Sequence, residues 1–135
     1  MTQHMSGPSD LSGQVAFITG GAGGMGRAIS AAFAAAGAKV IATDRAAKED
    51  LGAGIEYLQY DVTSRAETDA VMDAVIAKHG KIDILVLCAG IIARTPLGDS
   101  TDDEWDAIMN VIVRGVSNPT RKLFPPMGQQ GFGKI

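Results

Sequence analysis

Four short apolar segments, each rich in β-branched residues, recur along the chain. They span Val15–Thr19, Lys39–Thr43, Ile55–Tyr60 and Ile82–Leu87. Short runs of this composition, bounded by turn residues, are typical of strands rather than of helices. The pattern therefore predicts four strands that are buried on both faces of a sheet.

Helical signals separate these strands. Arg27–Ala36 is rich in alanine and ends before Gly37, a residue type that commonly terminates helices. Ser64 is followed three residues later by Glu67, the spacing of a capping box, and the helix that it opens ends at Gly80. Apolar residues four apart within this second helix form a stripe, which we expect to pack on the sheet.

The last third of the chain carries two opposing signals. Thr101 and Glu104 repeat the capping-box spacing, and apolar residues follow at steps of three and four up to Val116, which predicts a further helix. Residues 118–135 are richer in glycine and proline. The three prolines there predict that any helix continuing through this segment is broken or kinked: Pro119, Pro125 and Pro126.

Alternation of strands and helices predicts the fold class. The connections between strands are too long for hairpins, so the strands pair in parallel through right-handed crossovers. We expect an α/β Rossmann-type doubly wound sheet with strand order 3-2-1-4, truncated to about four strands. Residues 11–135 form this one domain, incomplete at its C-terminus, and residues 1–10 form a disordered tail. The strand starting at Ile82 then lies at an exposed apolar edge, which predicts a homo-oligomer.

Composition narrows the range of partners. The 135 residues carry a net charge of -3 with a pI near 5.2, which provides no positive field for nucleic acid. No apolar run approaches the roughly 20 residues of a spanning helix, and no signal peptide is visible, so we expect a cytoplasmic protein without a membrane partner. A single cysteine and two histidines provide no metal site.

Glycines dominate the turn between the first strand and the first helix. The segment from Thr19 to Gly26 reads Thr-Gly-Gly-Ala-Gly-Gly-Met-Gly. Such a turn lets the backbone approach a pyrophosphate, whose charge is favoured by unpaired N–H groups and by the positive end of the helix dipole. The alternative is a tight turn made only for packing. The first interpretation assigns five residues to a dinucleotide: Gly20, Gly23, Gly24, Met25 and Gly26.

An acidic residue follows at the end of the second strand. Asp44 lies about 20 residues beyond the glycine turn, where a carboxylate accepts the ribose hydroxyls of NAD and repels a 2′-phosphate. Arg45 beside it is able to bind that phosphate and so partly to offset Asp44. We expect Asp44 and Arg45 to contact the cofactor, with NAD preferred over NADP. A solvated residue at a strand end is the alternative for Asp44.

The spacing Thr-Gly-x-x-x-Gly-x-Gly resembles the short-chain dehydrogenase/reductase family, and the likeness runs from about Leu11 to the final residue. Asp61–Thr63 is similar to its third-strand motif, which contacts adenine. Ala89–Ile91 follows the fourth strand as the end of its Asn-Asn-Ala-Gly signature does, and Trp105–Met127 resembles its long fourth helix. The resemblance thus adds five residues to the expected cofactor site: Asp61, Val62, Ala89, Gly90 and Ile91.

The chain departs from the family pattern at two places. Leu87 and Cys88 occupy the two Asn positions of that signature. We interpret Cys88 as a small buried hydrophobe, with a reactive thiol as the alternative. In the fourth helix the family places an Asn three residues before a Gly, where it supports a proton-relay water. Here that position is Ile112, and Asn110 is turned away from it by about 200°.

The catalytic residues of the family lie beyond the matching segment. In the family, a sequence like Gly133–Ile135 leads into a strand that carries the catalytic Ser, followed by Tyr-x-x-x-Lys; neither Tyr57 nor Tyr60 has Lys four residues later. The resemblance implies the NAD(H)-binding part of an oxidoreductase for an alcohol or ketone, with no catalytic residue and no turnover in the chain as written. A non-catalytic nucleotide-binding module and a methyltransferase with a similar glycine loop are the alternatives.

Overall fold

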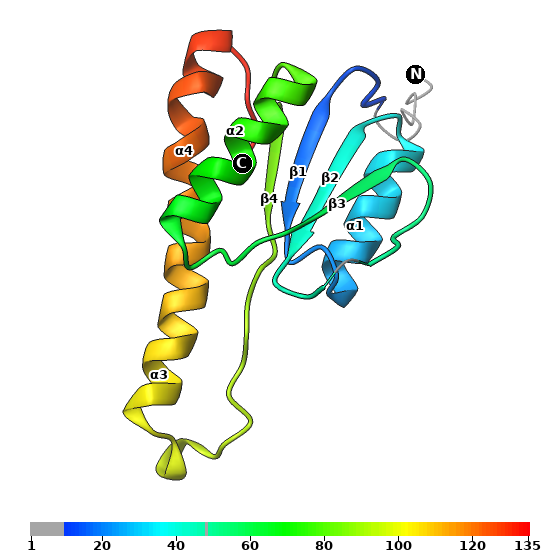
Figure 1. Cartoon of the computed structure of the whole chain (residues 1–135). Coiled ribbons are helices and arrows are strands. Elements are labelled where there is room, and N and C mark those ends of the chain that lie inside the picture. The colour runs from blue at the N-terminus through cyan, green and yellow to red at the C-terminus, as the bar shows by residue number, and fades with distance from the viewer. Residues whose placement is uncertain (1–9, 48) are drawn as a thin grey trace, which may run out of the picture.

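The computed structural model describes residues 10–47 and 49–135 and contains one sheet of four parallel strands (Figure 1). The strands are β1 (Val15–Thr19), β2 (Lys39–Asp44), β3 (Ile55–Gln59) and β4 (Ile84–Leu87). Their spatial order is β3-β2-β1-β4, which confirms the predicted topology. Residues 1–9 of the predicted tail lie outside the described residues.

Helices and helical turns connect the strands and continue after the last one. They are α1 (Gly24–Ala35), α2 (Arg65–His79), the 3₁₀ turn η1 (Leu97–Asp99), α3 (Asp102–Met109), the π-helical turn η2 (Asn110–Arg114) and α4 (Gly115–Gln130). The caps are those that the sequence predicts: Ser64 accepts a hydrogen bond from the Glu67 N–H, and Thr101 forms both bonds of a capping box with Glu104. Among the described residues, no helix is long and apolar enough to cross a membrane.

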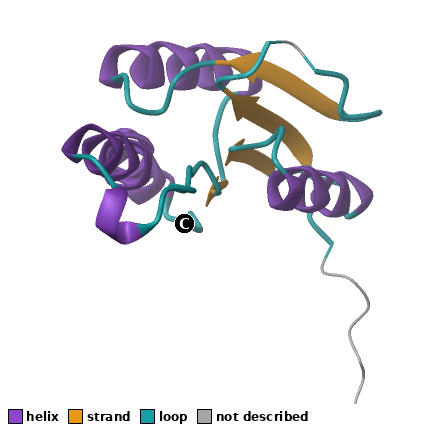
Figure 2. Ribbon diagram, turned by 90° about the horizontal axis from the view of Figure 1, so that it is seen from below, coloured by secondary structure: helices purple, strands orange, loops and turns teal. Residues whose placement is uncertain are grey.

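Helices cover both faces of the sheet (Figure 2). Alternate residues of β1 point to opposite sides: Ile18 packs toward α1 and Phe17 toward α2 and α4. Each large side chain buried in this way contributes about 1.5–3 kcal/mol. The prediction of burial on both faces holds for β1 and nearly all of β2, and for the first half of β4, whose second half is half-buried. It is wrong for β3, whose residues are half-buried or exposed because β3 lies at the edge.

The three prolines do not break the last helix. α4 runs from Gly115 to Gln130 through Pro119, Pro125 and Pro126, so of the predicted break or kink, the break does not occur. Its buried residues recur at steps of three or four, apart from the adjacent Asn118 and Pro119, and form one face, which packs on α2 and β4. This packing offsets the backbone hydrogen bonds that proline cannot make.

The free edge expected along β4 is partly covered by the end of the chain. The Leu85 N–H donates to the Lys134 carbonyl at 2.8 Å, and the Lys134 N–H donates to the Asp83 carbonyl at 3.0 Å. Ile84 and Lys134 thus form a parallel bridge. The edge that was expected to be bare is paired along its first half, so the edge alone no longer argues for an oligomer.

The carboxyl ends of all four strands meet at one edge of the sheet. β1 lies between β2 and β4, so the chain reverses its direction of progress across the sheet at β1. The loop after β4 and helix α3 extend beyond this edge (Figure 1). In open α/β sheets such a reversal point opens a crevice beside the strand ends.

Candidate functional site

A cleft of about 170 Å³ lies at the carboxyl ends of the four strands. Nine of the twelve residues that sequence analysis assigned to a cofactor line it: Gly20, Gly23, Asp44, Arg45, Asp61, Val62, Ala89, Gly90 and Ile91. They come from four separate turns of the chain. The fold therefore brings the predicted residues of all four strand ends together at one place.

The turn after β1 lies against the end of β4. Gly20 has a φ of 67°, and a Cβ added to it would lie 2.7 Å from backbone atoms of Cys88 and Ala89. The Cys88 N–H donates to the Thr19 carbonyl at 3.2 Å, and the Ala89 N–H donates to the Thr19 hydroxyl at the same distance. Only glycine fits at position 20, both in conformation and in space.

Helix α1 begins directly on this turn. Gly23 is its N-cap and carries no capping side chain. A Cβ on Gly26 would lie 2.1 Å from the Gly20 carbonyl oxygen, so the first helical turn contacts the backbone of the loop. Gly24, Met25 and Gly26 do not line the cleft, and the Met25 side chain is 72% exposed. Their N–H groups belong to the first turn of the helix, where no helical carbonyl precedes them.

Asp44 connects the end of β2 to the glycine turn. One carboxylate oxygen, Oδ2, accepts a hydrogen bond from the Ala22 N–H at 3.1 Å. The other, Oδ1, accepts from the Arg45 N–H at 2.7 Å and from the Ala46 N–H at 3.5 Å. The carboxylate is thus held by N–H groups of two turns of the chain. Each oxygen keeps acceptor capacity for a ligand hydroxyl.

The turn after β3 is held by side chains from two helices. Asp61 Oδ1 accepts from both the N–H and the hydroxyl of Thr63, at 2.9 and 2.8 Å. The Asp61 N–H donates to Glu67 at 3.0 Å, and the buried Asn118 side chain of α4 donates to the Val62 carbonyl at 2.9 Å. Asp61 and Val62 are thereby fixed at the rim of the cleft.

Three further residues line the cleft without having been assigned to it: Tyr60, Cys88 and Val111. Tyr60 directly precedes Asp61, and Cys88 directly precedes Ala89. Their positions next to assigned residues could therefore have indicated that both line the cleft. Val111 comes from the distant turn η2, and no local signal marks it. Cys88 is half-buried rather than buried, which corrects its interpretation as a core residue.

Neither strong acid–base chemistry nor a metal is evident in the described residues. Burial above all raises the pKa of Tyr60 well beyond its usual range, so its phenol gives up a proton less readily than a free tyrosine. Across residues 10–47 and 49–135, no three His, Cys, Asp or Glu side chains gather as metal ligands would. The cleft is thus lined by backbone groups of the turns and by two carboxylates, those of Asp44 and Asp61.

Comparison with known proteins identifies the family to which the chain belongs. The family model described as short chain dehydrogenase matches residues 14–135. The chain belongs to the short chain dehydrogenase family. Its members are oxidoreductases with an NAD(P)-binding Rossmann domain, which decides against the methyltransferase alternative.

Individual relatives agree. A 3-oxoacyl-[acyl-carrier-protein] reductase of Thermotoga maritima is 37% identical over 93% of this chain and 54% of its own length. The solved structure of a 3-ketoacyl-(acyl-carrier-protein) reductase from Brucella melitensis, complexed with NADH, has a TM-score of 0.82 at 36% identity, over 90% of this chain and 55% of its own. A ligand-free aldohexose dehydrogenase from Thermoplasma acidophilum has the same TM-score at 31% identity, over 91% of this chain and 48% of its own. The chain thus spans about half the length of these relatives.

The π-helical turn η2 carries the residue at which the sequence departs from the family pattern. Ile112 lies in the π-helical turn η2 and is 44% exposed. Asn110, two residues earlier, is also exposed and begins the same turn. At the position where the family resemblance leads us to expect an amide, this turn thus carries an exposed apolar side chain.

Two glycine substitutions test the packing of the glycine turn. Gly26→Ala should lower the free energy of unfolding by about 1–3 kcal/mol or more, because the new Cβ meets the Gly20 carbonyl 2.1 Å away. Gly24→Ala is the matched control: nothing lies within 4 Å of its added Cβ, so stability should stay unchanged or rise by up to about 1 kcal/mol through helix propensity. Urea unfolding followed by circular dichroism measures both. Equal stability of the two variants would contradict the close contact.

Proposed function

We propose that the chain is the NAD(H)-binding part of a short-chain oxidoreductase that interconverts an alcohol and a ketone. The observation that carries the proposal is the hydrogen bond between Asp44 and the Ala22 N–H, 3.1 Å long, which puts a carboxylate and the glycine turn at one cleft. A dinucleotide needs both features, N–H groups for its pyrophosphate and an acceptor for its ribose.

The residues present fit a dinucleotide. Glycine at positions 20 and 26 lets the turn pack against the end of β4 and the start of α1, where an added Cβ would meet backbone atoms, and the α1 N–H groups beside this turn suit an anion. In this proposal Gly20, Gly23, Gly24, Met25 and Gly26 hold the pyrophosphate through their backbone. Asp44 holds the adenosine ribose, Asp61 and Val62 hold the adenine ring, and Ala89, Gly90 and Ile91 hold the other half of the molecule. When bound, the nicotinamide accepts or donates a hydride.

We assign the cofactor as NAD(H) rather than NADP(H). Asp44 is partly buried and bound by two loops, so its negative charge cannot move away from a 2′-phosphate. Arg45 is exposed, and a cation that remains in solvent offsets this repulsion only weakly. The Brucella melitensis relative was solved with NADH, which is consistent with this assignment.

A homo-oligomer is also part of the proposal. Large apolar residues are exposed on α3 and α4, among them Trp105 at 62% and Phe124 at 70%. Exposed apolar surface of this kind is typical of protein interfaces.

The substrate is proposed only as an alcohol or ketone, since the chain spans about half the length of its relatives.

Removing the Asp44 charge should relax cofactor preference. For the unmodified chain we expect calorimetry to give tighter binding of NADH than of NADPH. Asp44→Ala and Asp44→Asn should each weaken NADH binding about tenfold or more, because a hydrogen bond to a charged group is lost, and should leave NADPH unchanged or improved through Arg45. Asp106→Ala, which removes an exposed carboxylate from α3, is the control. Tighter NADPH binding by the unmodified chain would show the assignment of Asp44 to be wrong.

A non-catalytic nucleotide-binding module is the second candidate, favoured by Ile112 at the family's Asn position. We expect the 135-residue chain to bind NADH without turnover, because these residues contain no Tyr-x-x-x-Lys. A positioned proton donor alone contributes about 10²- to 10⁴-fold to rate. Ile112→Asn should remain at background, since a restored relay amide has no such tyrosine to serve. The assay follows NADH absorbance over a panel of secondary alcohols and ketones, and robust turnover by protein of confirmed mass would contradict this expectation.

A further inference from the structure

Two side chains of β3 hold the turn that follows Asp44. The register pairs Ala42 with Tyr57 and Asp44 with Gln59, so Tyr57 and Gln59 lie on the same face of β3, the face toward α1. The Tyr57 hydroxyl donates to the Ala46 carbonyl at 2.9 Å. The Gln59 amide donates to the Arg45 carbonyl at 3.0 Å. Two consecutive carbonyls of the turn are therefore held by the neighbouring strand.

The N–H groups of the same two residues point to Asp44. Arg45 and Ala46 both donate to Asp44 Oδ1, at 2.7 and 3.5 Å. The turn is thus held from both sides, by β3 through its carbonyls and by the Asp44 carboxylate through its N–H groups. This arrangement fixes the orientation of the carboxylate and also the point from which the Arg45 side chain leaves the backbone.

We propose that Tyr57 and Gln59 are positioning residues for cofactor selectivity: by holding the carbonyls of Arg45 and Ala46 they keep Asp44 turned to the ribose and Arg45 in solvent. This inference rests on the proposed binding of NAD(H) at Asp44. Neither side chain lines the cleft, and neither is expected to touch the cofactor. Their effect is on which nucleotide the turn admits.

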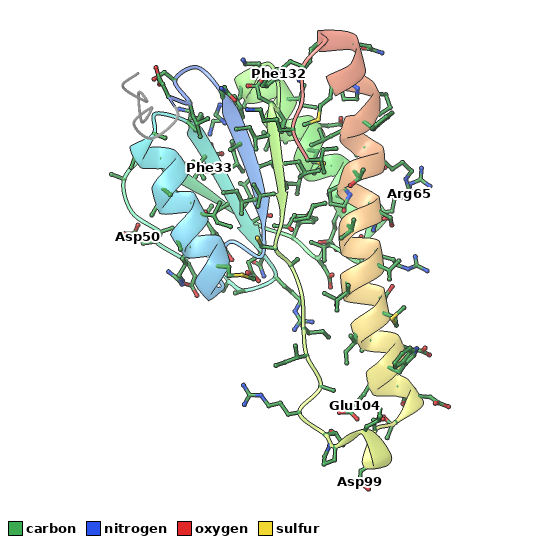
Figure 3. All side chains as sticks on the ribbon, turned by 180° about the vertical axis from the view of Figure 1, so that it is seen from behind. Phe33, Asp50, Arg65, Asp99, Glu104 and Phe132 are labelled. Atoms are coloured by element: carbon green, nitrogen blue, oxygen red, sulfur yellow. The ribbon has the colours of Figure 1, made fainter. Side chains whose placement is uncertain are left out.

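Two further features support this role. Burial and the nearby Asp44 charge raise the pKa of the Tyr57 phenol, so the hydroxyl keeps its proton near neutral pH and remains a donor. A second cation on this side of the cleft is already engaged: Arg27 of α1 donates to the Ala22 carbonyl at 2.8 Å and pairs with Glu49. Arg27 is thus engaged by the glycine turn and by Glu49, while Arg45 lies exposed at the rim of the cleft. Figure 3 shows the molecule from the side of α1, with Asp50 labelled in the segment before β3.

The experiment measures the dissociation constants of NADH and NADPH for Tyr57→Phe, Gln59→Leu and the double variant of the whole chain. Tyr57→Phe should lower the ratio of the NADPH constant to the NADH constant about three- to tenfold, the effect of one lost hydrogen bond. The exposed Gln59 should have a smaller effect, and the double variant the largest. The control is Glu56→Gln, which breaks the pairs of β3 with Lys78 and His79 on the opposite face and should leave the ratio unchanged.

The outcomes separate this inference from the function on which it rests. If the unmodified chain binds neither nucleotide, or prefers NADPH, the proposed function fails and the inference fails with it. If the unmodified chain prefers NADH and Asp44→Ala relaxes that preference, while Tyr57→Phe and Gln59→Leu keep the original ratio, only the inference is overturned. An equal loss of both affinities also overturns it, because that is the result of a purely structural role. Should Tyr57→Phe fail to fold by circular dichroism, Gln59→Leu decides.

Discussion

The close contact of the turn after β1 with the end of β4 and the start of α1 is the constraint on which the site depends. Added side-chain atoms at Gly20 or Gly26 would lie 2.1–2.7 Å from backbone atoms, distances at which the backbone itself must move. Because the turn is this tight, α1 starts directly beside the crevice between β1 and β4. In the proposed function, the first N–H groups of this helix receive the pyrophosphate.

Asp44 connects the tight glycine turn to the end of the second strand. Its carboxylate bonds to the glycine turn through Oδ2 and to its own turn through Oδ1, so the charge has a fixed place relative to the helix start. A parallel sheet makes this possible, because β1 and β2 end side by side. The edge strand β3 lies beside β2, and two of its side chains donate hydrogen bonds to the turn after Asp44. In the proposed function, Asp44 and the glycine turn contribute to affinity, and the β3 side chains contribute to selectivity.

Much of the fold was predictable because its signals are local. The caps at Ser64 and Thr101 and the glycine turn before α1 mark the ends of elements, and strand order follows from parallel crossovers. Features that depend on distant contacts were not predictable. Val111 reaches the cleft only because a helix from the last third packs there, and α4 continues through Pro119 because its buried face outweighs the lost hydrogen bonds. The pairing of Lys134 with Ile84 likewise depends on tertiary structure.

The central claim, that a dinucleotide binds at the carboxyl ends of the strands, is tested most directly by titrating isotope-labelled protein with NADH and following the backbone amide resonances. The account predicts that the largest shifts fall on residues 20–26, Asp44, Asp61 and residues 89–91. The opposite edge of the sheet carries a hollow of about 590 Å³, lined among others by Gln14, Lys39 and His79. Shifts confined to that hollow, or no saturable shifts at all, would contradict the account.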